Sequence, residues 1–179
     1  MDARIPTHRP LRLDLACGTA KRPGFFGVDV VATPHVDLVL DLTRTPWPFA
    51  DASVDEVHCA HFFEHLDGDQ RLDFMHELHR ILVPGGKATI IVPYARSEGA
   101  LQDPTHRWPP LLETSFSYFN AESRRSMGVD HYPIRCDFDF EVGLTLAAEW
   151  QHRSEQERLG AIRHLWNVAS EMTVLLTRR

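Results

Sequence analysis

The sequence predicts an α/β fold with a doubly wound, mostly parallel sheet, and three features of the chain support this prediction. Residues 11–15 alternate apolar and charged side chains before a turn of small residues, which is typical of a short strand. A helix-spaced apolar pattern runs to Leu82 and stops at residues 84–86, Pro-Gly-Gly. Residues 88–92 are almost wholly apolar, as expected for a central strand of a parallel sheet.

Length and composition indicate one soluble globular domain. The 179 residues suffice for a sizeable core, and 43% apolar and 25% charged residues are ordinary values. A formal net charge of -6 disfavours unassisted binding to nucleic acid, because such binders usually carry a basic surface. The three cysteines, Cys17, Cys59 and Cys136, form no CxxC pair and no even disulfide framework, so we expect a reducing, cytoplasmic location. No apolar run approaches membrane-spanning length, so no membrane association is expected.

The first half of the chain supplies four predicted strands. Residues 11–15 are followed by strand candidates at 25–30, 36–40 and 54–60. The stretch 17–24 is too short for a full crossover helix between parallel strands. Either the first helix is a single turn, or the strands begin later than the pattern indicates.

The second half combines one clear helix with a long irregular stretch. We expect a helix capped by Asp67 or Asp69 and running to Leu82. Residues 94–132 are irregular and carry the aromatic group Phe116, Tyr118 and Phe119, which favours a lid or a substrate wall. A strand at 138–150, a helix at 154–166 and a strand at 172–177 then predict an antiparallel edge strand at the C-terminus. Residues 1–10, with prolines and charges but no apolar signal core, are expected to be a flexible lead-in to a single domain over 11–179.

Two residues point to a nucleotide site at the carboxyl edge of the predicted sheet. Gly18 permits a tight turn and a close approach of a ligand to the backbone. Asp29 ends the second predicted strand, where an acid accepts hydrogen bonds from ribose hydroxyls in nucleotide-binding folds. A turn without a ligand and a surface acid remain the alternatives. No complete GxGxxG or GxxxxGK[ST] is present, which disfavours a nicotinamide dehydrogenase and a P-loop ATPase.

Six short motifs follow one another in a fixed order within residues 11–93. They are Leu-Asp-Leu-Ala-Cys-Gly at 13–18, Gly-Val-Asp at 27–29, Asp-Leu at 41–42, Phe-Ala-Asp-Ala-Ser-Val-Asp-Glu-Val at 49–57, Glu-His at 64–65 and Leu-His-Arg-Ile-Leu-Val-Pro-Gly-Gly at 78–86. Their order and spacing resemble the class I S-adenosylmethionine-dependent methyltransferases, close to the methyltransferase type 11 group and its small, phage-like members. The resemblance implies a Rossmann-like fold and S-adenosylmethionine as the cofactor.

The resemblance also implies a set of cofactor-binding positions. They are Asp14, Ala16, Cys17, Gly18, Asp29, Asp41, Leu42 and His61. By analogy, residues 14–18 line the amino-acid and ribose parts of the cofactor, and Asp29 holds the ribose hydroxyls. Asp41 then reaches the adenine amino group, Leu42 packs on the ring, and His61 meets the methionine end. Ala16 departs from the family pattern, which usually has glycine there.

Methyl transfer from a sulfonium requires an aligned donor and acceptor, and it requires a base only if the acceptor must lose a proton. The catalytic candidates are His65, Glu64 and the more distant His106, because a histidine titrates near neutral pH. A hydrogen-bonded structural role remains the alternative for each histidine. His61, Glu64 and His65 also share one helical face, and with His106 they form a possible divalent metal site. Some small-RNA 2′-O-methyltransferases are similar at this place.

We therefore expect a methyltransferase that transfers a methyl group to an O or N acceptor, most simply a small molecule. The Asn/Asp-Pro-Pro-Tyr/Phe motif of amino-group DNA methyltransferases is absent after the fourth predicted strand, where residues 61–64 read His-Phe-Phe-Glu. Two alternatives stay open. One is a non-catalytic module of the same fold that binds a partner through the aromatic lid. The other is a metal-assisted methyltransferase that uses His61, Glu64, His65 and His106. The sequence carries no signal for the oligomeric state.

Overall fold

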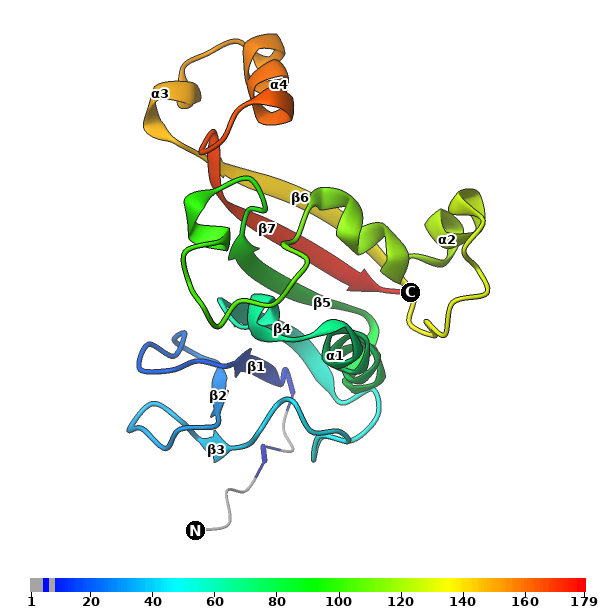
Figure 1. Cartoon of the computed structure of the whole chain (residues 1–179). Helices are drawn as coiled ribbons and strands as arrows, with labels where there is room; N and C mark the ends of the chain where they lie inside the picture. Colours follow the sequence, from blue (N-terminus) through cyan, green and yellow to red (C-terminus); the bar gives the residue numbers. More distant parts are fainter. Residues whose placement is uncertain (1–4, 7–8) are drawn as a thin grey trace.

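Seven strands form one mixed sheet in the order β3-β2-β1-β4-β5-β7-β6 in the computed structural model, which describes residues 5–6 and 9–179 (Figure 1). The strands are β1 (Arg12–Leu15), β2 (Phe26–Asp29), β3 (Leu38–Val39), β4 (Val54–Ala60), β5 (Leu82–Pro93), β6 (Phe138–Leu146) and β7 (Ala169–Arg178). The expected flexible lead-in at 1–10 lies largely outside the described residues. Within it, Arg9 donates to the carboxylate of Asp55.

The directions of the strands confirm the mostly parallel, Rossmann-like sheet with an antiparallel C-terminal strand. The pairs β3-β2, β2-β1, β1-β4 and β4-β5 are parallel, and β7 runs antiparallel to both β5 and β6. The C-terminal strand does not form the edge, however, because β7 lies between β5 and β6. Met172, Val174 and Leu176 on one face of β7 are fully buried in the core, and pairing on both sides satisfies the backbone groups of this strand.

The hydrophobic core lies on one face of the sheet. One cross-strand row on this face consists of Leu13, Val57, Ala88 and Leu176, all fully buried. The helix α1 (Gly68–Ile81) and the 3₁₀ helix η3 (Glu113–Phe119) cover this face with buried residues that include Phe74 and Phe116 (Figure 1). Strands β1, β4, β5 and β7 thus follow the period-2 pattern of a sheet that is covered on this side.

The opposite face of the sheet carries polar side chains. The next cross-strand row consists of Arg12, Glu56, Lys87, Thr177 and Asp139. In the described part of the chain, no helix occurs between β1 and β4. Residues 16–25, which join β1 to β2, form turns only, because a parallel crossover with a full helix needs a dozen residues or more. Of the two alternatives for this stretch, the single-turn helix is absent from the described residues, and β2 begins at Phe26, one residue later than the predicted strand.

Helix α1 confirms the prediction made from its apolar spacing. Asp67, and not Asp69, is the N-cap: its side chain accepts from the backbone N–H of Gln70, and the Gln70 side chain accepts from the N–H of Asp67. This capping box fixes the start of the helix at Gly68, directly after the N-cap. The helix ends at Ile81, and β5 begins at once, earlier than the predicted strand at 88–92. An irregularity in the β4-β5 pairing accommodates the Pro-Gly-Gly segment.

The C-terminal elements differ in length from the predicted ones. The strand predicted at 138–150 ends at Leu146, and the short helix α3 (Ala148–Gln151) follows it. The helix α4 (Glu155–His164) begins after Ser154, whose side chain forms a capping box with Glu157. Figure 1 shows α3 and α4 standing off the sheet, beyond the ends of β6 and β7.

The segment 94–132 has two parts that lie in different surroundings. The first part contains the short 3₁₀ helix η2 (Glu98–Ala100) and lies near the carboxyl ends of β4 and β5. The second part holds η3 and α2 (Ala121–Met127). Phe116 and Phe119 are buried in the hydrophobic core, so they do not form the predicted substrate wall. Tyr118, at 37% exposure, remains accessible.

Candidate functional site

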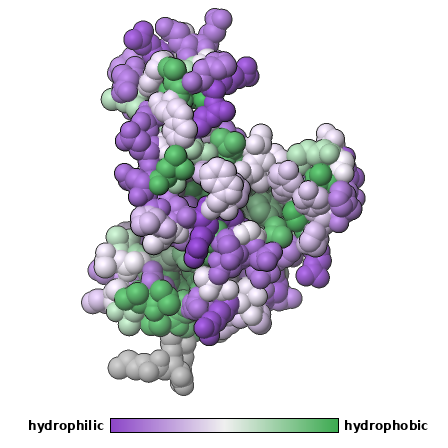
Figure 2. All heavy atoms as spheres, viewed as in Figure 1, coloured by the Kyte–Doolittle hydropathy of each residue, from purple (hydrophilic) through white to green (hydrophobic). Residues whose placement is uncertain are grey.

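The carboxyl ends of β1, β2 and β4 surround a small pocket of about 150 Å³. Its lining consists of Ala16, Asp29, Val30, Leu40, Asp41, Leu42, Thr43 and Phe62. Four of these residues, Ala16, Asp29, Asp41 and Leu42, are positions that the sequence analysis assigned to a cofactor. Figure 2 shows hydrophobic atoms on the surface in the region of β2 and β3, where Val30 and Val39 are more than half exposed.

The turn after β1 is held by the carboxylate at the end of β2. Asp29 accepts hydrogen bonds from the backbone N–H of Gly18 at 2.8 Å and of Val31 at 2.9 Å. Gly18 has a φ of 54°, which agrees with its predicted role in a tight turn. Ala16 has a φ of 56° and carries the strain of a left-handed backbone at the position where glycine is usual.

Asp14 and Cys17 do not line this pocket. The Asp14 side chain is 3% exposed, and its two oxygens contact Nδ1 of His58 at 2.8 Å and the N–H of Arg22 at 2.7 Å. Asp14 therefore holds the β1-β2 connection through the backbone of Arg22. Burial, with help from the nearby carboxylates of Asp14 and Asp29, raises the pKa of the Cys17 thiol to about 11, so this thiol stays protonated.

The far wall of the pocket combines one charged and two apolar groups. The hydroxyl and the N–H of Thr43 both donate to Oδ1 of Asp41, which lowers the pKa of this carboxyl and keeps it ionised. Leu42 and Phe62 supply apolar surface beside it. Sequence reasoning missed Phe62, and the signal for it is the aromatic pair 62–63 directly after β4.

A second cleft, of about 370 Å³, opens at the carboxyl ends of β4 and β5. Four chain segments line it, with the residues His61, Glu64, His65, Pro93, Gly99, Gln102, Asp103, His106, Ser170 and Glu171. His61 lies here and not in the first pocket, with its Nε2 3.1 Å from Glu171. Because His61 and Phe62 are consecutive and line different hollows, the cleft and the pocket adjoin.

The structure brings the three predicted catalytic residues together at one end of this cleft. The rings of His65 and His106 lie 4.8 Å apart, centroid to centroid, at an interplanar angle of 73°. Glu64 is 6% exposed, and neither carboxylate oxygen has a hydrogen-bond partner among the described residues. Burial raises the pKa of Glu64, while the nearby imidazoles of His61, His65 and His106 oppose this rise.

Arg71 on α1 fastens the segment that carries His106. Its guanidinium is buried and donates to the carbonyl oxygens of Pro109 at 2.8 Å and Arg107 at 3.1 Å. It also reaches the carbonyls of Phe63 and Glu64 at 3.4 Å. The N–H of Arg107 donates to Glu64 O at 2.9 Å. Sequence reasoning did not single out Arg71, because it appears there as one more charged residue on a helix.

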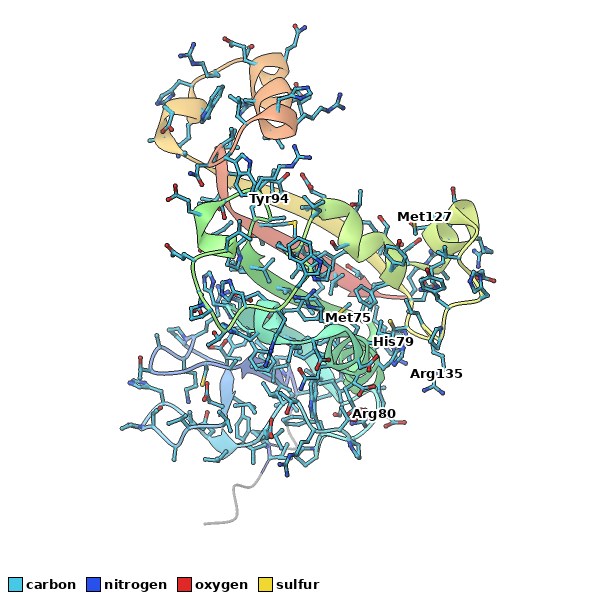
Figure 3. All side chains as sticks on the ribbon, viewed as in Figure 1. Met75, His79, Arg80, Tyr94, Met127 and Arg135 are labelled. Atoms are coloured by element: carbon cyan, nitrogen blue, oxygen red, sulfur yellow. The ribbon has the colours of Figure 1, made fainter. Side chains whose placement is uncertain are left out.

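A further polar hollow lies away from this edge of the sheet. It is lined by His79 and Arg80, at the C-terminal end of α1, and by Arg135. Figure 3 shows these three side chains together and far from Tyr94, which follows β5 at the carboxyl edge. They do not take part in the two adjoining hollows.

The strand order and strand directions are those of the Rossmann-like fold of solved methyltransferases. A SAM-dependent methyltransferase from Archaeoglobus fulgidus shares it, with 16% identity, a TM-score of 0.66, and coverage of 96% of this chain and 88% of that chain. The methyltransferase bound to a Haloferax volcanii methyltransferase activator is 19% identical to this chain, with a TM-score of 0.53. The match covers 98% of this chain and 86% of that chain. The Burkholderia thailandensis 1,6-didemethyltoxoflavin-N1-methyltransferase, with bound 1,6-didemethyltoxoflavin and S-adenosylhomocysteine, is 12% identical with a TM-score of 0.55. This match covers 94% of this chain and 70% of that chain. At these identities, the structural likeness shows the fold.

The sequence itself matches a family model over residues 13–90, described as a methyltransferase domain. Among curated protein sequences, no match to this chain is found. Residues 13–90 therefore resemble a methyltransferase domain, and the fold of nearly the whole chain is that of solved methyltransferases, one of which binds S-adenosylhomocysteine. Within the described residues, no helix is long and apolar enough to cross a membrane.

Proposed function

We propose that the chain binds S-adenosylmethionine across the pocket at Asp29 and transfers its methyl group to an acceptor in the adjoining cleft at Glu64. The observation that carries this proposal is the position of His61 and Phe62, which are adjacent in sequence and line the cleft and the pocket respectively. A donor in one hollow and an acceptor in the other meet at this segment. Such alignment contributes roughly 7–11 kcal/mol to catalysis of a two-substrate reaction.

The size of the pocket indicates which part of the cofactor it receives. Its volume of about 150 Å³ is below the roughly 300–1,000 Å³ of a complete ligand site. We assign it to the adenine ring, between Leu42 and Phe62, with the adenine amino group toward the ionised Asp41. The ribose then lies at Asp29, and the methionine part follows residues 16–18 toward the cleft.

The cleft favours a small acceptor with an oxygen or nitrogen nucleophile. Its volume of about 370 Å³ is that of a small-molecule site. The net charge of -6 disfavours a polyanionic substrate such as nucleic acid. His65, Glu64 and His106 are the groups within the cleft that can take a proton from the acceptor. The cysteines of the described chain are free thiols, which fits a reducing compartment such as the cytoplasm.

Thermal unfolding with added ligand tests the cofactor assignment. S-adenosylmethionine or S-adenosylhomocysteine at 100 times its dissociation constant is expected to stabilise the protein by about 2.7 kcal/mol. For a chain of this size, the midpoint then rises by roughly 5–10 °C. NAD is the control and should give no shift. A shift with NAD alone, or with none of the three, contradicts the proposal.

Turnover distinguishes an enzyme from a binding module of the same fold. We expect release of S-adenosylhomocysteine when the protein is supplied with the cofactor and a mixed pool of small alcohols, amines and hydroxylated acids. Transfer only to RNA or DNA contradicts the small-molecule assignment. Binding of the cofactor without turnover in any pool supports the non-catalytic alternative.

A further inference from the structure

We propose that Glu64, His65 and His106 form a binding site for one divalent transition-metal ion. The site lies in the cleft described above, but metal binding does not require that the proposed methyl transfer is correct. Each of the three residues offers one ligand atom, and these atoms all lie within 4.8 Å of one another. Ligand atoms around a tetrahedral ion are roughly 3.4 Å apart at metal–ligand distances of about 2.1 Å. Small side-chain rotations therefore suffice to close the site.

The unpaired carboxylate of Glu64 is the second observation that points to a cation. Both of its oxygens are buried and have no hydrogen-bond partner in the part of the chain that the structure describes. A buried polar group without a partner costs about 1–3 kcal/mol, and an ionised one costs more. The nearest possible partner, His61 Nδ1, is 3.5 Å from Oε1 and forms no hydrogen bond with it. The nearby guanidinium of Arg71 donates to backbone carbonyl oxygens instead. A bound cation supplies the partner that this carboxylate lacks.

Among the described residues, each of the two histidines makes a hydrogen bond through Nδ1 and none through Nε2, and Nε2 of His106 lies 3.9 Å from Asp103 Oδ2. Nδ1 of His106 lies 3.1 Å from the carbonyl oxygen of Ala100 and can only donate to it. Nδ1 of His65 lies 2.9 Å from Oγ1 of Thr105, and Thr105 in turn donates to Asp103 Oδ1 at 2.7 Å. Both arrangements place the ring proton on Nδ1 and leave an Nε2 lone pair. Such outer contacts orient metal-binding histidines in known sites.

The composition of the site indicates the class of metal. Two imidazoles and one carboxylate suit Zn²⁺, Co²⁺, Ni²⁺ or Fe²⁺, whereas Mg²⁺ prefers a shell of oxygen atoms. Three protein ligands leave coordination positions open, as in catalytic sites and unlike closed structural sites. The polar side chains of Gln102, Asp103 and Glu171 also line this cleft.

Titration of the chelator-treated protein with Co²⁺ tests the proposal, because Co²⁺ reports its coordination through its visible absorption. We expect one equivalent to bind and to produce the absorption bands of a nitrogen- and oxygen-coordinated ion. Glu64→Gln keeps the shape of the side chain but removes a metal ligand. Loss of a hydrogen-bond partner of a ligand weakens metal binding by roughly 10–100-fold, and Glu64→Gln should weaken Co²⁺ binding by more than this. Thr105→Val removes only such a contact and should fall within that range. His164→Ala, at an exposed histidine of α4, should bind Co²⁺ like the unaltered protein.

Two results overturn the metal proposal: no Co²⁺ binding by the unaltered protein, or equal affinity in Glu64→Gln. Circular dichroism of each variant shows whether it folds. If Glu64→Gln does not fold, His106→Gln provides a second variant that lacks a metal ligand. Calorimetric titration with S-adenosylhomocysteine, with and without Zn²⁺, separates the two proposals. Cofactor binding without metal binding leaves the methyltransferase assignment intact and removes the metal site. Metal binding without cofactor binding supports the metal site and removes the cofactor assignment.

Discussion

Asp29→Ala is expected to weaken the binding of S-adenosylmethionine by roughly 10- to 150-fold. Its carboxylate holds the N–H groups of Gly18 and Val31, and we assign to it the ribose hydroxyls of the cofactor. A hydrogen bond to a charged group contributes about 1.5–3 kcal/mol, and about 1.4 kcal/mol corresponds to tenfold in affinity. Isothermal titration with S-adenosylhomocysteine measures the change.

Two further variants separate ribose binding from the architecture of the turn. Asp29→Asn retains one acceptor oxygen and should show a smaller loss of affinity than Asp29→Ala. Asp139→Ala removes an exposed carboxylate of β6, on the polar face of the sheet, and should leave the affinity unchanged. An unaltered affinity in Asp29→Ala would show that the ribose is bound elsewhere.

Arg71→Met is expected to lower the free energy of unfolding by about 3 kcal/mol, because several carbonyl oxygens lose a charged donor at a buried position. For a chain of this length, this corresponds to a fall of roughly 6–12 °C in the unfolding midpoint. Methionine fills a similar volume, so the loss of hydrogen bonds dominates over any cavity. Differential scanning calorimetry measures the effect.

The same variant links stability to the cleft. Without the contacts of Arg71 to Arg107 and Pro109, His106 loses its fixed position, while the pocket at Asp29 is built from other segments. We therefore expect Co²⁺ affinity to fall and S-adenosylhomocysteine affinity to persist. Arg125→Met, at an exposed arginine of α2 outside both hollows, is the matched control and should change neither quantity. A midpoint equal to that of the unaltered protein would mean that Arg71 does not anchor this segment.

The candidate pocket was largely predictable from the sequence. Residues 13–18, 27–29 and 41–42 each end a strand, and the carboxyl ends of neighbouring parallel strands meet at one sheet edge. This geometry explains why Ala16, Asp29 and Asp41 line one hollow. The role of Asp14 was not predictable in the same way. Its carboxylate is taken up by His58 of β4 and by the N–H of Arg22, and strand periodicity does not encode these contacts.

The cleft depended on contacts between segments far apart in the chain. The sequence shows Glu64 and His65 directly after β4. His106 lies about 40 residues further on, and this separation in sequence does not tell how close the three side chains are in space. The carbonyl contacts of Arg71 bring the segment 107–109 against the end of η1 (Phe63–His65). Backbone carbonyls are present at every residue, so no sequence pattern marks the ones that a buried arginine will bind.

The sequence by itself determined the strand and helix segments, the parallel sheet and the identity of the residues at its carboxyl edge. These properties follow from apolar periodicity and from turn and cap residues, which act over short stretches of chain. The tertiary structure alone decided that β7 lies inside the sheet, that Phe116 belongs to the core, and that Glu64, His65 and His106 converge on one cleft. These outcomes depend on packing and on desolvation of groups from distant segments, and local patterns do not encode such contacts.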